Sequence, residues 1–360
     1  MMAVVRAVFA RLAVALVAVA ACAPAPAAPA APRPIAELAT YQGSDRQQIL
    51  EAGARAEKKL TWYTSLAGEI VDRMAEGFKK KYPFIDVEIF RGTESELVTR
   101  ATQEAQAGQP SFDVLETQVT AIKLLYDGQL LINYSSPTVK NVPEEFKTRI
   151  GSGDVVESAT DRVSIISFGY NTNLIPESAV PKTYQDLMNP ALKGKLALSG
   201  TNTGQRWLGS ILNILGEEKG KQWLADFSKQ QQPRVQQVSG KALLDLIAKG
   251  EIPASPTIFK DHVDLAVQET KAPVKWVPLE PVVGNPGQAA LAAKAPHPNA
   301  ALLFIDYLFG DGAKVFQQNA YTTAADKVPF KLWIPERGKS LKDIEKDTKL
   351  WNDLFKSTFR

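Results

Sequence analysis

Apolar side chains recur along this chain at two alternating spacings, one typical of strands and one typical of helices. The apolar segment 60–63 predicts a short strand, and Ile70, Met74 and Phe78 follow it at the four-residue spacing of one helical face. Strands that alternate with helices of this length predict βαβ units and a mainly parallel sheet. In the first half the predicted elements are strand 60–63, helix 69–82, strand 86–90, helix 94–107 and strand 113–115.

The second half of the chain repeats this alternation, so a second α/β unit is expected there. Residues 162–171 are the strongest strand candidate, and 194–199 is another. Residues 282–287 contain Asn-Pro-Gly, which disfavours regular structure, so we expect either a turn that faces a ligand cleft or a plain connector. The other predicted helices cover 45–58, 241–249, a segment that opens at Pro298, and 341–355.

The N-terminal segment has the pattern of an export signal followed by a tether. Two early arginines precede the apolar run 12–20, which is shorter than the about 20 residues that a membrane-spanning helix needs. Cys22 follows small residues and precedes a stretch rich in alanine and proline. We therefore expect a signal peptide over 1–21, lipidation of Cys22 and an extended tether over 22–34, in a periplasmic protein held to a bacterial membrane by lipid. The alternative is an ordinary signal peptide with an incidental cysteine.

Composition narrows the class of protein further. Cys22 is the only cysteine, so the chain cannot form an internal disulfide and its fold depends on burial. About 300 residues beyond the tether are enough for two hydrophobic cores. Once Arg6 and Arg11 leave with the signal, the 42 basic residues fall to 40 against 39 acidic ones, a net charge of +1. That balance, without a basic run, argues against nucleic acid as a partner.

Several short motifs follow one another in a fixed order: Leu60–Ser65 with the helix 69–82, Phe112–Gln118, Gly128–Leu131, Asp161–Val163 leading to Gly169–Asn173, Pro190–Leu196, Lys249–Pro253 and Pro298–Leu308. This order resembles the periplasmic solute-binding proteins of ABC importers, in the branch that includes the ferric-ion-binding proteins. The resemblance covers nearly everything from Leu60 to about Phe330. Its specificity lies in the order of the motifs, since each motif alone is weakly specific.

The resemblance implies an α/β fold of the type II periplasmic-binding-protein class. In that fold each of two lobes is a mainly parallel sheet flanked by helices, and crossing hinge strands join the lobes. The implied first lobe covers 35–164 and about 277–320, and the second covers 165–276 and about 321–360. A solute that bridges the lobes stabilises the closed state alone, which an ABC permease in the inner membrane would recognise. The implied protein is a monomer without cofactor or resident metal, and it does no chemistry on its solute.

The resemblance also places four segments of this chain in the cleft. They are the loop after the first strand, the residues after the third strand, the start of the long strand 162–171, and residues 199–205. In the last segment, glycines, hydroxyls and the free N–H groups of a helix start suit an anion. The expected ligand-binding residues are Thr64, Ser65, Glu116, Gln118, Arg162, Ser199, Gly200, Thr201, Asn202, Thr203 and Lys260.

These candidates have purely structural alternatives. Residues 199–205 can be a capped helix start with Thr203 as the N-cap and no ligand. Arg162 offers a fork of donors for a carboxylate or phosphate, but it can instead be an ion-pair partner within the fold. Lys260 can be a solvated surface lysine. Trp62 and Tyr63 can stack on a ligand or belong to the core.

One departure from the ferric-binding pattern bears on the ligand. Iron-binding members carry paired tyrosines shortly after the segment equivalent to 250–253, because phenolate oxygens suit a ferric ion. Here residues 254–262 contain no tyrosine, Lys260 lies near the expected position, and Ala67 stands where some members have a histidine. We therefore expect a small polar organic solute, anionic or zwitterionic, with ferric ion as an alternative. Asp261–Asp264 is a conceivable metal fragment but is more simply a polar helix start.

Two further function classes stay open at this point. No nucleophile elbow, nucleotide-binding lysine loop, dinucleotide fingerprint or zinc-binding helix pair occurs, so an extracellular enzyme is the least favoured. A ligand-sensing partner of a membrane receptor would share the fold and the cleft. Only its membrane partner would distinguish such a sensor from an importer component.

Overall fold

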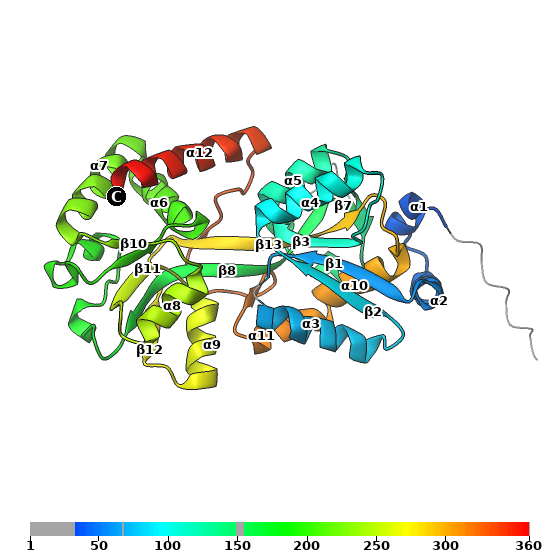
Figure 1. The fold of residues 1–360 in the computed structure, drawn as a ribbon, viewed down its shortest axis with the longest axis horizontal. Coiled ribbons are helices and arrows are strands. Elements are labelled where there is room, and N and C mark those ends of the chain that lie inside the picture. The colour runs from blue at the N-terminus through cyan, green and yellow to red at the C-terminus, as the bar shows by residue number, and fades with distance from the viewer. Residues whose placement is uncertain (1–32, 67, 149–154, 360) are drawn as a thin grey trace, which may run out of the picture. The chain divides into compact units, whose positions relative to one another are not determined.

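The computed structural model describes residues 33–66, 68–148 and 155–359. The predicted signal peptide 1–21, Cys22 and the tether as far as residue 32 lie outside the described residues. Two long strands, β8 (Ser158–Asn171) and β13 (Val282–Ala292), run through the middle of the fold and join its two lobes (Figure 1). Within the described ranges, no helix is long and apolar enough to cross a membrane.

The first lobe follows the strand–helix order that the apolar spacing predicts. Its helix α4 (Glu94–Gln106) begins with a capping box of Thr93 and Glu96 and ends before Gly108, whose φ of 68° suits a glycine. The other elements before β8 are α1 (Ile35–Thr40), α2 (Arg46–Glu57), β1 (Lys59–Thr64), α3 (Gly68–Lys81), β2 (Asp86–Arg91), β3 (Val114–Gln118), α5 (Val119–Asp127), β4 (Leu131–Ile132), β5 (Tyr134–Ser135), β6 (Lys147–Thr148) and β7 (Val155–Val156).

The second lobe lies between the two crossing strands in the sequence. Its elements are β9 (Ala197–Ser199), α6 (Asn202–Leu215), α7 (Glu217–Gln231), β10 (Arg234–Gln236), α8 (Gly240–Ala248), β11 (Ala254–Phe259), α9 (Lys260–Thr270) and β12 (Val274–Val277). After β13 the chain forms α10 (Pro298–Phe309), α11 (Asp311–Gln318), β14 (Thr322–Thr323), β15 (Leu332–Trp333) and α12 (Leu341–Thr358). Helices α10 and α12 begin at Pro298 and Leu341, so both predicted starts are confirmed.

One mixed sheet connects the lobes, in the order β11-β8-β13-β3-β1-β2. Strands β2, β1 and β3 run parallel, as the alternation with helices predicts. Strand β13 is antiparallel to both of its neighbours, β3 and β8. Because β13 pairs with both β3 and β8, the carboxyl end of β3 lies next to the strands that cross between the lobes.

Each lobe has its own hydrophobic core. In the first lobe, the rings of Trp62 and Phe304 lie 4.9 Å apart, and in the second those of Trp207 and Phe227 lie 5.5 Å apart. Burial of one such side chain stabilises the fold by about 1.5–3 kcal/mol. Trp62 and Tyr63 are both fully buried and belong to hydrophobic cores, which supports the core interpretation for each of them.

The prediction of a turn or connector at 282–287 is wrong, because these residues begin β13. Pro286 is the register partner of Val163 on β8, while pairing with β3 starts only at Gly287. The missing N–H of the proline therefore falls where β13 has no β3 partner. A proline is tolerated in a strand at such a position, and the Asn-Pro-Gly signal is overridden by pairing with strands distant in the sequence.

Candidate functional site

Four of the predicted ligand-binding residues share one face of the central sheet. Thr64 on β1 is the register partner of Glu116 on β3. Gln118 on β3 and Arg162 on β8 are both register partners of Gly287, which lies on β13 between them. Register partners project from the same face of a sheet, so these side chains gather where the first lobe meets the crossing strands. Glu116 and Gln118 lie within β3, which corrects the expectation of a loop there.

Arg162 and Glu116 form a buried ion pair at the centre of this face. Arg162 Nη2 lies 3.0 Å from Glu116 Oε1, and the two side chains are 5% and 0% exposed. Thr64 Oγ1 donates a hydrogen bond of 2.6 Å to Glu116 Oε2. The ion-pair interpretation of Arg162 is therefore confirmed. Its Nε nevertheless has no hydrogen-bond partner among the described residues, so the guanidinium keeps donor capacity.

Ser65 and Gln118 complete the first-lobe side of the site. The Ser65 backbone N–H donates to the carbonyl oxygen of Glu116 at 3.0 Å, which holds the loop after β1 against β3. Ser65 Oγ is buried and has no partner in the described part of the chain. Gln118 Oε1 accepts a hydrogen bond of 2.9 Å from Thr117 Oγ1. Backbone contacts thus position this loop, and the Ser65 hydroxyl is available to a ligand.

A β-bulge in β8 brings Asp161 into the same region. The register between β8 and β13 skips Asp161, which is therefore the extra residue of the bulged strand. Asp161 is 3% exposed; its Oδ1 accepts the Arg162 N–H at 2.9 Å, and its Oδ2 has no partner among the described residues. Burial, and after it the negative charge of Glu116, raise the pKa of Asp161 to about 8.

Asp261 and Tyr321 add two more buried polar groups. Asp261 is the second residue of α9, and its Oδ2 has no hydrogen-bond partner within the described ranges. Burial lowers the pKa of Arg162, but its interactions with Glu116 first, and then with Asp161, Tyr321 and Asp261, outweigh burial, so that the pKa is raised. Burial raises the pKa of Asp261 and that of Tyr321, so the phenol stays protonated at neutral pH.

The segment before α6 is a capped helix start, but its N-cap is Thr201 and not Thr203. Thr201 Oγ1 accepts the Thr203 N–H at 3.4 Å, and Ser199 Oγ lies 2.7 Å from Thr201 Oγ1. The Gly200 N–H donates to Gln236 O at 2.8 Å. The predicted strand end at Ser199 is confirmed, but the cap lies two residues earlier than predicted, because the backbone turns into α6 directly after the extended residue Thr201.

The remaining candidates of this segment differ in exposure. Asn202 is exposed at the first position of α6, whereas Thr203 is buried. Ser199 N–H donates to Thr257 Oγ1 at 2.8 Å, which ties the loop to β11. The hydroxyls of Ser199 and Thr201 therefore serve the turn, and Asn202 is the member whose side chain is open to solvent.

Lys260 is not a solvated surface lysine. Its Nζ lies 2.8 Å from Asp264 Oδ2 and donates to Ala320 O at 3.1 Å, and its side chain is 20% exposed. The first contact is within α9, and the second joins α9 to the segment after α11. Lys260 therefore links two elements, and much of its charge is already neutralised by Asp264. Residues 260–270 form a helix, as the polar helix-start interpretation predicts.

The described residues contain no group of three or more His, Cys, Asp or Glu side chains that could hold a metal ion. His262 is buried beside Asp261 at 3.9 Å, and burial lowers its pKa, so the ring is neutral at pH 7. Arg162 stands among the carboxylates, and its positive charge opposes a cation of high charge. The charge of Arg162 therefore disfavours a ferric ion at this face.

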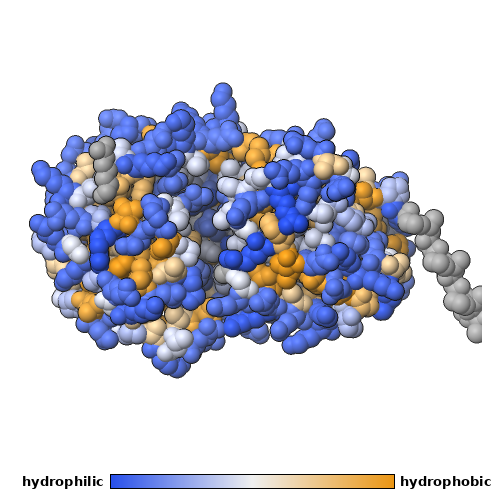
Figure 2. All heavy atoms as spheres, in the orientation of Figure 1, coloured by the Kyte–Doolittle hydropathy of each residue, from blue (hydrophilic) through white to orange (hydrophobic). Residues whose placement is uncertain are grey.

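The surface between the two lobes is hollowed (Figure 2), and β8 and β13 cross that region in the same orientation (Figure 1). A cavity of about 220 Å³ borders Thr160 and Gln288 of these strands together with Glu336 and Lys339. Thr160 and Gln288 form the next register pair after Arg162 and Gly287. Consecutive pairs project from opposite faces of a sheet, so this cavity lies on the face opposite to Arg162. Lys339 is paired with Asp347 at 2.5 Å.

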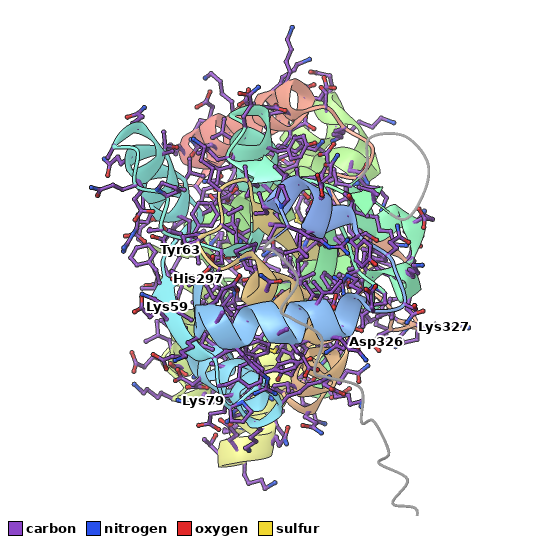
Figure 3. The ribbon with its side chains drawn as sticks, turned by 90° about the vertical axis from the view of Figure 1, so that its right-hand side faces the viewer. Lys59, Tyr63, Lys79, His297, Asp326 and Lys327 are labelled. Atoms are coloured by element: carbon purple, nitrogen blue, oxygen red, sulfur yellow. The ribbon has the colours of Figure 1, made fainter. Side chains whose placement is uncertain are left out.

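A second cavity, of about 360 Å³, lies away from the crossing strands at one edge of the first lobe. Lys59, Tyr63 and His297, which border it, lie close together in Figure 3, apart from Asp326 and Lys327. Its charged groups are engaged: Lys59 pairs with Glu88 at 2.7 Å, and His297 Nδ1 lies 2.9 Å from Asp113 Oδ2. This cavity contains none of the predicted ligand-binding residues.

Among the predicted ligand-binding residues, Arg162 lies at the centre of the site. Three residues near it, Asp161, Asp261 and Tyr321, were not predicted to bind ligand. Asp161 immediately precedes Arg162, and an Asp-Arg pair inside an otherwise apolar strand pattern was a usable signal. Asp261 was considered as part of a metal fragment or of a polar helix start, and not as a ligand-binding residue. Tyr321 carries no sequence signal, because it reaches the site from a segment that follows α11.

Comparison with known proteins identifies the family to which this fold and cleft belong. Residues 62–315 match the model of the family described as bacterial extracellular solute-binding protein. This chain belongs to that family. An uncharacterized protein of Haemophilus influenzae is 25% identical to this solute-binding protein over 273 residues, which are 72% of this chain and 75% of the relative.

Solved structures share the fold of this solute-binding protein at low sequence identity. Iron-bound HitA from Pseudomonas aeruginosa has a TM-score of 0.67 at 18% identity, over 82% of this chain and 99% of HitA. AfuA from Actinobacillus pleuropneumoniae, with exogenous fructose-6-phosphate bound, has a TM-score of 0.64 at 18% identity, over 84% and 98% of the two chains. The expected two-lobed fold of the type II periplasmic-binding-protein class is thereby confirmed. These two proteins hold different ligands, so the fold does not select the solute.

Proposed function

We propose that this protein binds a small polar organic solute that carries an anionic group, in the cleft between its lobes, and delivers it to an ABC permease. The proposal includes export by the signal 1–21, lipidation at Cys22 and action as a monomer in the periplasm. It assigns 35–164 and about 277–320 to one lobe, and 165–276 and about 321–360 to the other. Its support is the family, the buried arginine of the crossing strand and the sequence pattern of the N-terminus.

The observation that carries the proposal is the donor capacity of Arg162. The guanidinium is 5% exposed, one amine nitrogen is paired with Glu116, and Nε has no partner among the described residues. A buried donor without a partner costs about 1–3 kcal/mol, which a ligand acceptor would recover. Arginine is the side chain best suited to grip a carboxylate or phosphate through several N–H groups.

Loops from both lobes would complete the site around this anion. Ser65 supplies an unpartnered hydroxyl from the first lobe, and the N-terminus of the 14-residue helix α6 with Asn202 supplies donors from the second. A solute that contacts both sets of donors binds the closed state better than the open one. Differential affinity of this kind drives hinge closure.

A thermal-shift screen followed by calorimetry tests the proposal, with small carboxylates, phosphonates, sugar phosphates, amino acids and ferric citrate as probes. A ligand at 100 times its dissociation constant adds about 2.7 kcal/mol to the free energy of unfolding. Arg162→Ala is expected to weaken binding of an anionic solute by about 2–5 kcal/mol. Arg55→Ala, which removes a 59% exposed arginine on α2, is the matched control and is expected to change nothing. Unchanged affinity in Arg162→Ala would exclude Arg162 from the site.

Three other functions have less support. Ferric ion transport lacks the tyrosine pair at 254–262 and a fitting group of ligands among the described residues, and binding of ferric citrate alone in the screen would favour it. A sensor that signals to a membrane receptor shares every feature above, and a permease reconstitution assay distinguishes it. An enzyme would have to turn over one of the screened compounds.

A further inference from the structure

Lys260 stands at a position that its own helix favours only weakly. It is the first residue of α9, where a positive charge opposes the positive N-terminal end of the helix dipole. It pairs with Asp264 at 2.8 Å, but a helical ion pair is more stable when the acidic residue precedes the basic one. The reason for a lysine at this position is therefore to be sought outside α9.

The chain turns at the C-terminal end of α11 through a Schellman motif, in which Ala320 N–H donates to Gln317 O at 3.1 Å. Tyr321 N–H donates to Phe316 O at 3.0 Å, and the rings of these two residues lie 5.9 Å apart, as the hydrophobic contact of the motif requires. Ala320 has a φ of 65°, the left-handed conformation that a glycine usually takes there. Residues 319–320, the α11 corner, are thus held in a defined shape by local bonds.

Lys260 reaches the α11 corner from the other lobe. Its Nζ donates to Ala320 O at 3.1 Å, at the negative C-terminal end of the α11 dipole. Phe316 and Tyr321 beside the corner belong to the hydrophobic core of the first lobe, whereas Val263 of α9 belongs to a core cluster of the second. Figure 1 shows α9 next to α11 where the two lobes meet. The contact of Lys260 with Ala320 therefore joins the lobes.

The other end of α9 is attached to the same corner. Glu269 lies 2.7 Å from Arg73 of α3, and Arg73 Nη1 also donates to the side-chain oxygen of Asn319. Asn319 is the C-cap of α11 and immediately precedes Ala320. Both ends of α9 are thus bound to consecutive residues of the α11 corner, Lys260 directly and Glu269 through Arg73.

The α11 corner lies close to the candidate site along the chain. β14 begins two residues after Ala320, and its Thr323 is the register partner of Arg162 on β8. The segment that Lys260 contacts is therefore the one that continues into the strand beside Arg162. If α9 moved away from the first lobe, its contact with this segment would break.

We propose that Lys260 is a positioning residue, which holds α9 on the α11 corner and so keeps part of the solute-free protein in the closed arrangement of this structure. The Arg73–Glu269 pair assists it, but its side chains are 43% and 37% exposed against 20% for Lys260, so it is expected to contribute less. In this assignment Lys260 does not contact the solute, which differs from the ligand-binding role predicted from the sequence. The inference goes beyond the proposed function, since it concerns the protein without solute.

Distances between two spin labels in the solute-free protein test this inference. Cys22 is the only cysteine, so in a Cys22→Ser background labels attach only to cysteines introduced at two exposed positions, Lys80 of α3 and Glu218 of α7. These positions lie on different lobes and take no part in the contacts described above. Double electron–electron resonance is expected to show a population at the distance that this structure gives. Lys260→Met, which keeps the length of the side chain and removes its donor, is expected to lower that population about threefold or more.

Matched variants separate the role of Lys260 from a general loss of charge. Lys241→Met removes the lysine of a similar pair, with Asp245 four residues later in α8 of the same lobe, and is expected to leave the closed population unchanged. Lys260→Arg keeps a charged donor and is expected to restore the closed population to within about twofold of the unmodified protein. Circular dichroism checks that each variant is folded.

Solute affinity gives a second measurement. When a solute binds only the closed arrangement, its apparent dissociation constant rises as the closed fraction falls, so Lys260→Met is expected to weaken every compound that binds in the screen by about the same factor, threefold to tenfold. That factor should match the loss of closed population seen with the spin labels. A lysine that touched the solute would instead weaken anionic compounds more than the others.

The outcomes separate this inference from the proposed function. If the solute-free protein shows only longer distances, or if Lys260→Met leaves the closed population unchanged, the inference is wrong and the proposed function stands. A Lys260→Met variant that stays closed but loses affinity for anionic compounds alone would make Lys260 a ligand-binding residue and would also overturn the inference. If closure depends on Lys260 and no compound in the screen binds, the inference is supported and the proposed function fails for these compounds.

Discussion

Arg162 Nη2 lies 3.0 Å from Glu116 Oε1, and the ion pair is almost completely buried, with side-chain exposures of 5% and 0%. Glu116 lies on β3 of the first lobe, whereas Arg162 lies on β8, the strand that crosses between the lobes. The pair therefore couples the hinge to the candidate ligand site. Changes at either residue are expected to affect both stability and binding.

Removal of the Glu116 charge is expected to destabilise the protein strongly. Glu116→Gln leaves Arg162 buried without its nearest counter-ion, and loss of one partner of a buried pair costs about 3–5 kcal/mol. Urea denaturation measures the change in the free energy of unfolding. The control is Asp353→Asn, since the Lys349–Asp353 pair is 77% and 58% exposed and is worth less than about 1 kcal/mol. Equal effects of the two substitutions would show that burial does not determine the strength of the Arg162 pair.

Gly287 is expected to tolerate no side chain. An added Cβ would lie 2.5 Å from Glu116 Oε1 and 2.8 Å from Arg162 Cζ, inside the ion pair. Gly287→Ala should therefore destabilise the protein by about 1–3 kcal/mol, as overpacking does, and weaken solute binding as well. Gly68→Ala is the control, because no atom lies within 4 Å of its added Cβ. If Gly287→Ala matches this control in both measurements, the sheet face has more room than the structure shows.

The stability of the protein is expected to fall as the pH rises, through Asp161. Burial and the charge of Glu116 raise the pKa of Asp161 from its ordinary value of 3.8 to about 8, so the folded state holds a proton that the unfolded state releases. The favourable effect of that proton is full below pH 4 and is lost as the pH rises through about 8. The charged groups that face Asp161 are Glu116 and Arg162.

Denaturation of the unmodified protein and of Asp161→Asn at pH 5, 6.5 and 8 checks this pH dependence. The free energy of unfolding of the unmodified protein is expected to decrease relative to the variant over this series, because the asparagine has no proton to lose. Parallel curves for the two proteins would mean that Asp161 is ionised in the folded state throughout this range.

A contact on the surface is expected to contribute modestly to closure. Arg73 on α3 of the first lobe lies 2.7 Å from Glu269 on α9 of the second lobe, with side chains 43% and 37% exposed. Exposed pairs contribute less than about 1 kcal/mol and are screened by salt. Arg73→Ala should therefore weaken binding of the tightest anion in the screen by less than about fivefold, and the difference should shrink at 0.5 M salt. A larger, salt-independent loss would place Arg73 in the ligand site itself.

The alternation of apolar spacing was sufficient to predict the first lobe, because its strands and helices carry strong local patterns. β1, α3, β2 and α4 lie where the spacing predicts them, whereas β3 continues to Gln118, past its predicted end at residue 115. β13 was misjudged, since its Asn-Pro-Gly segment has the local signature of a turn and is held extended only by its pairing with β8 and β3. The cap was predicted at Thr203 and lies at Thr201, although the strand end at Ser199 was predicted correctly.

The candidate site was predictable in part. Arg162, Thr64, Glu116 and Gln118 were inferred by resemblance to the family, and register places them on one face. Asp161 depends on a bulge, Asp261 on the packing of α9, and Tyr321 on a segment that follows α11. The Asp161-Arg162 pair gives a local signal that a polar group interrupts the strand, but the place of each of these side chains in the site depends on pairing and packing.

The sequence by itself determined the class of this protein: an α/β chain of two units with an export pattern, a near-neutral charge and no catalytic motif. These properties are local or additive, since each depends on the spacing or count of residues along one stretch of chain. Only the tertiary structure decided that Glu116 pairs with Arg162 and that Asp161 and Asp261 are buried where they act on the same guanidinium, because these residues lie on β3, β8 and α9 and are brought into one region by strand pairing and packing. The electrostatics of the site depend on distance in space and on burial, and neither quantity is encoded in any single segment.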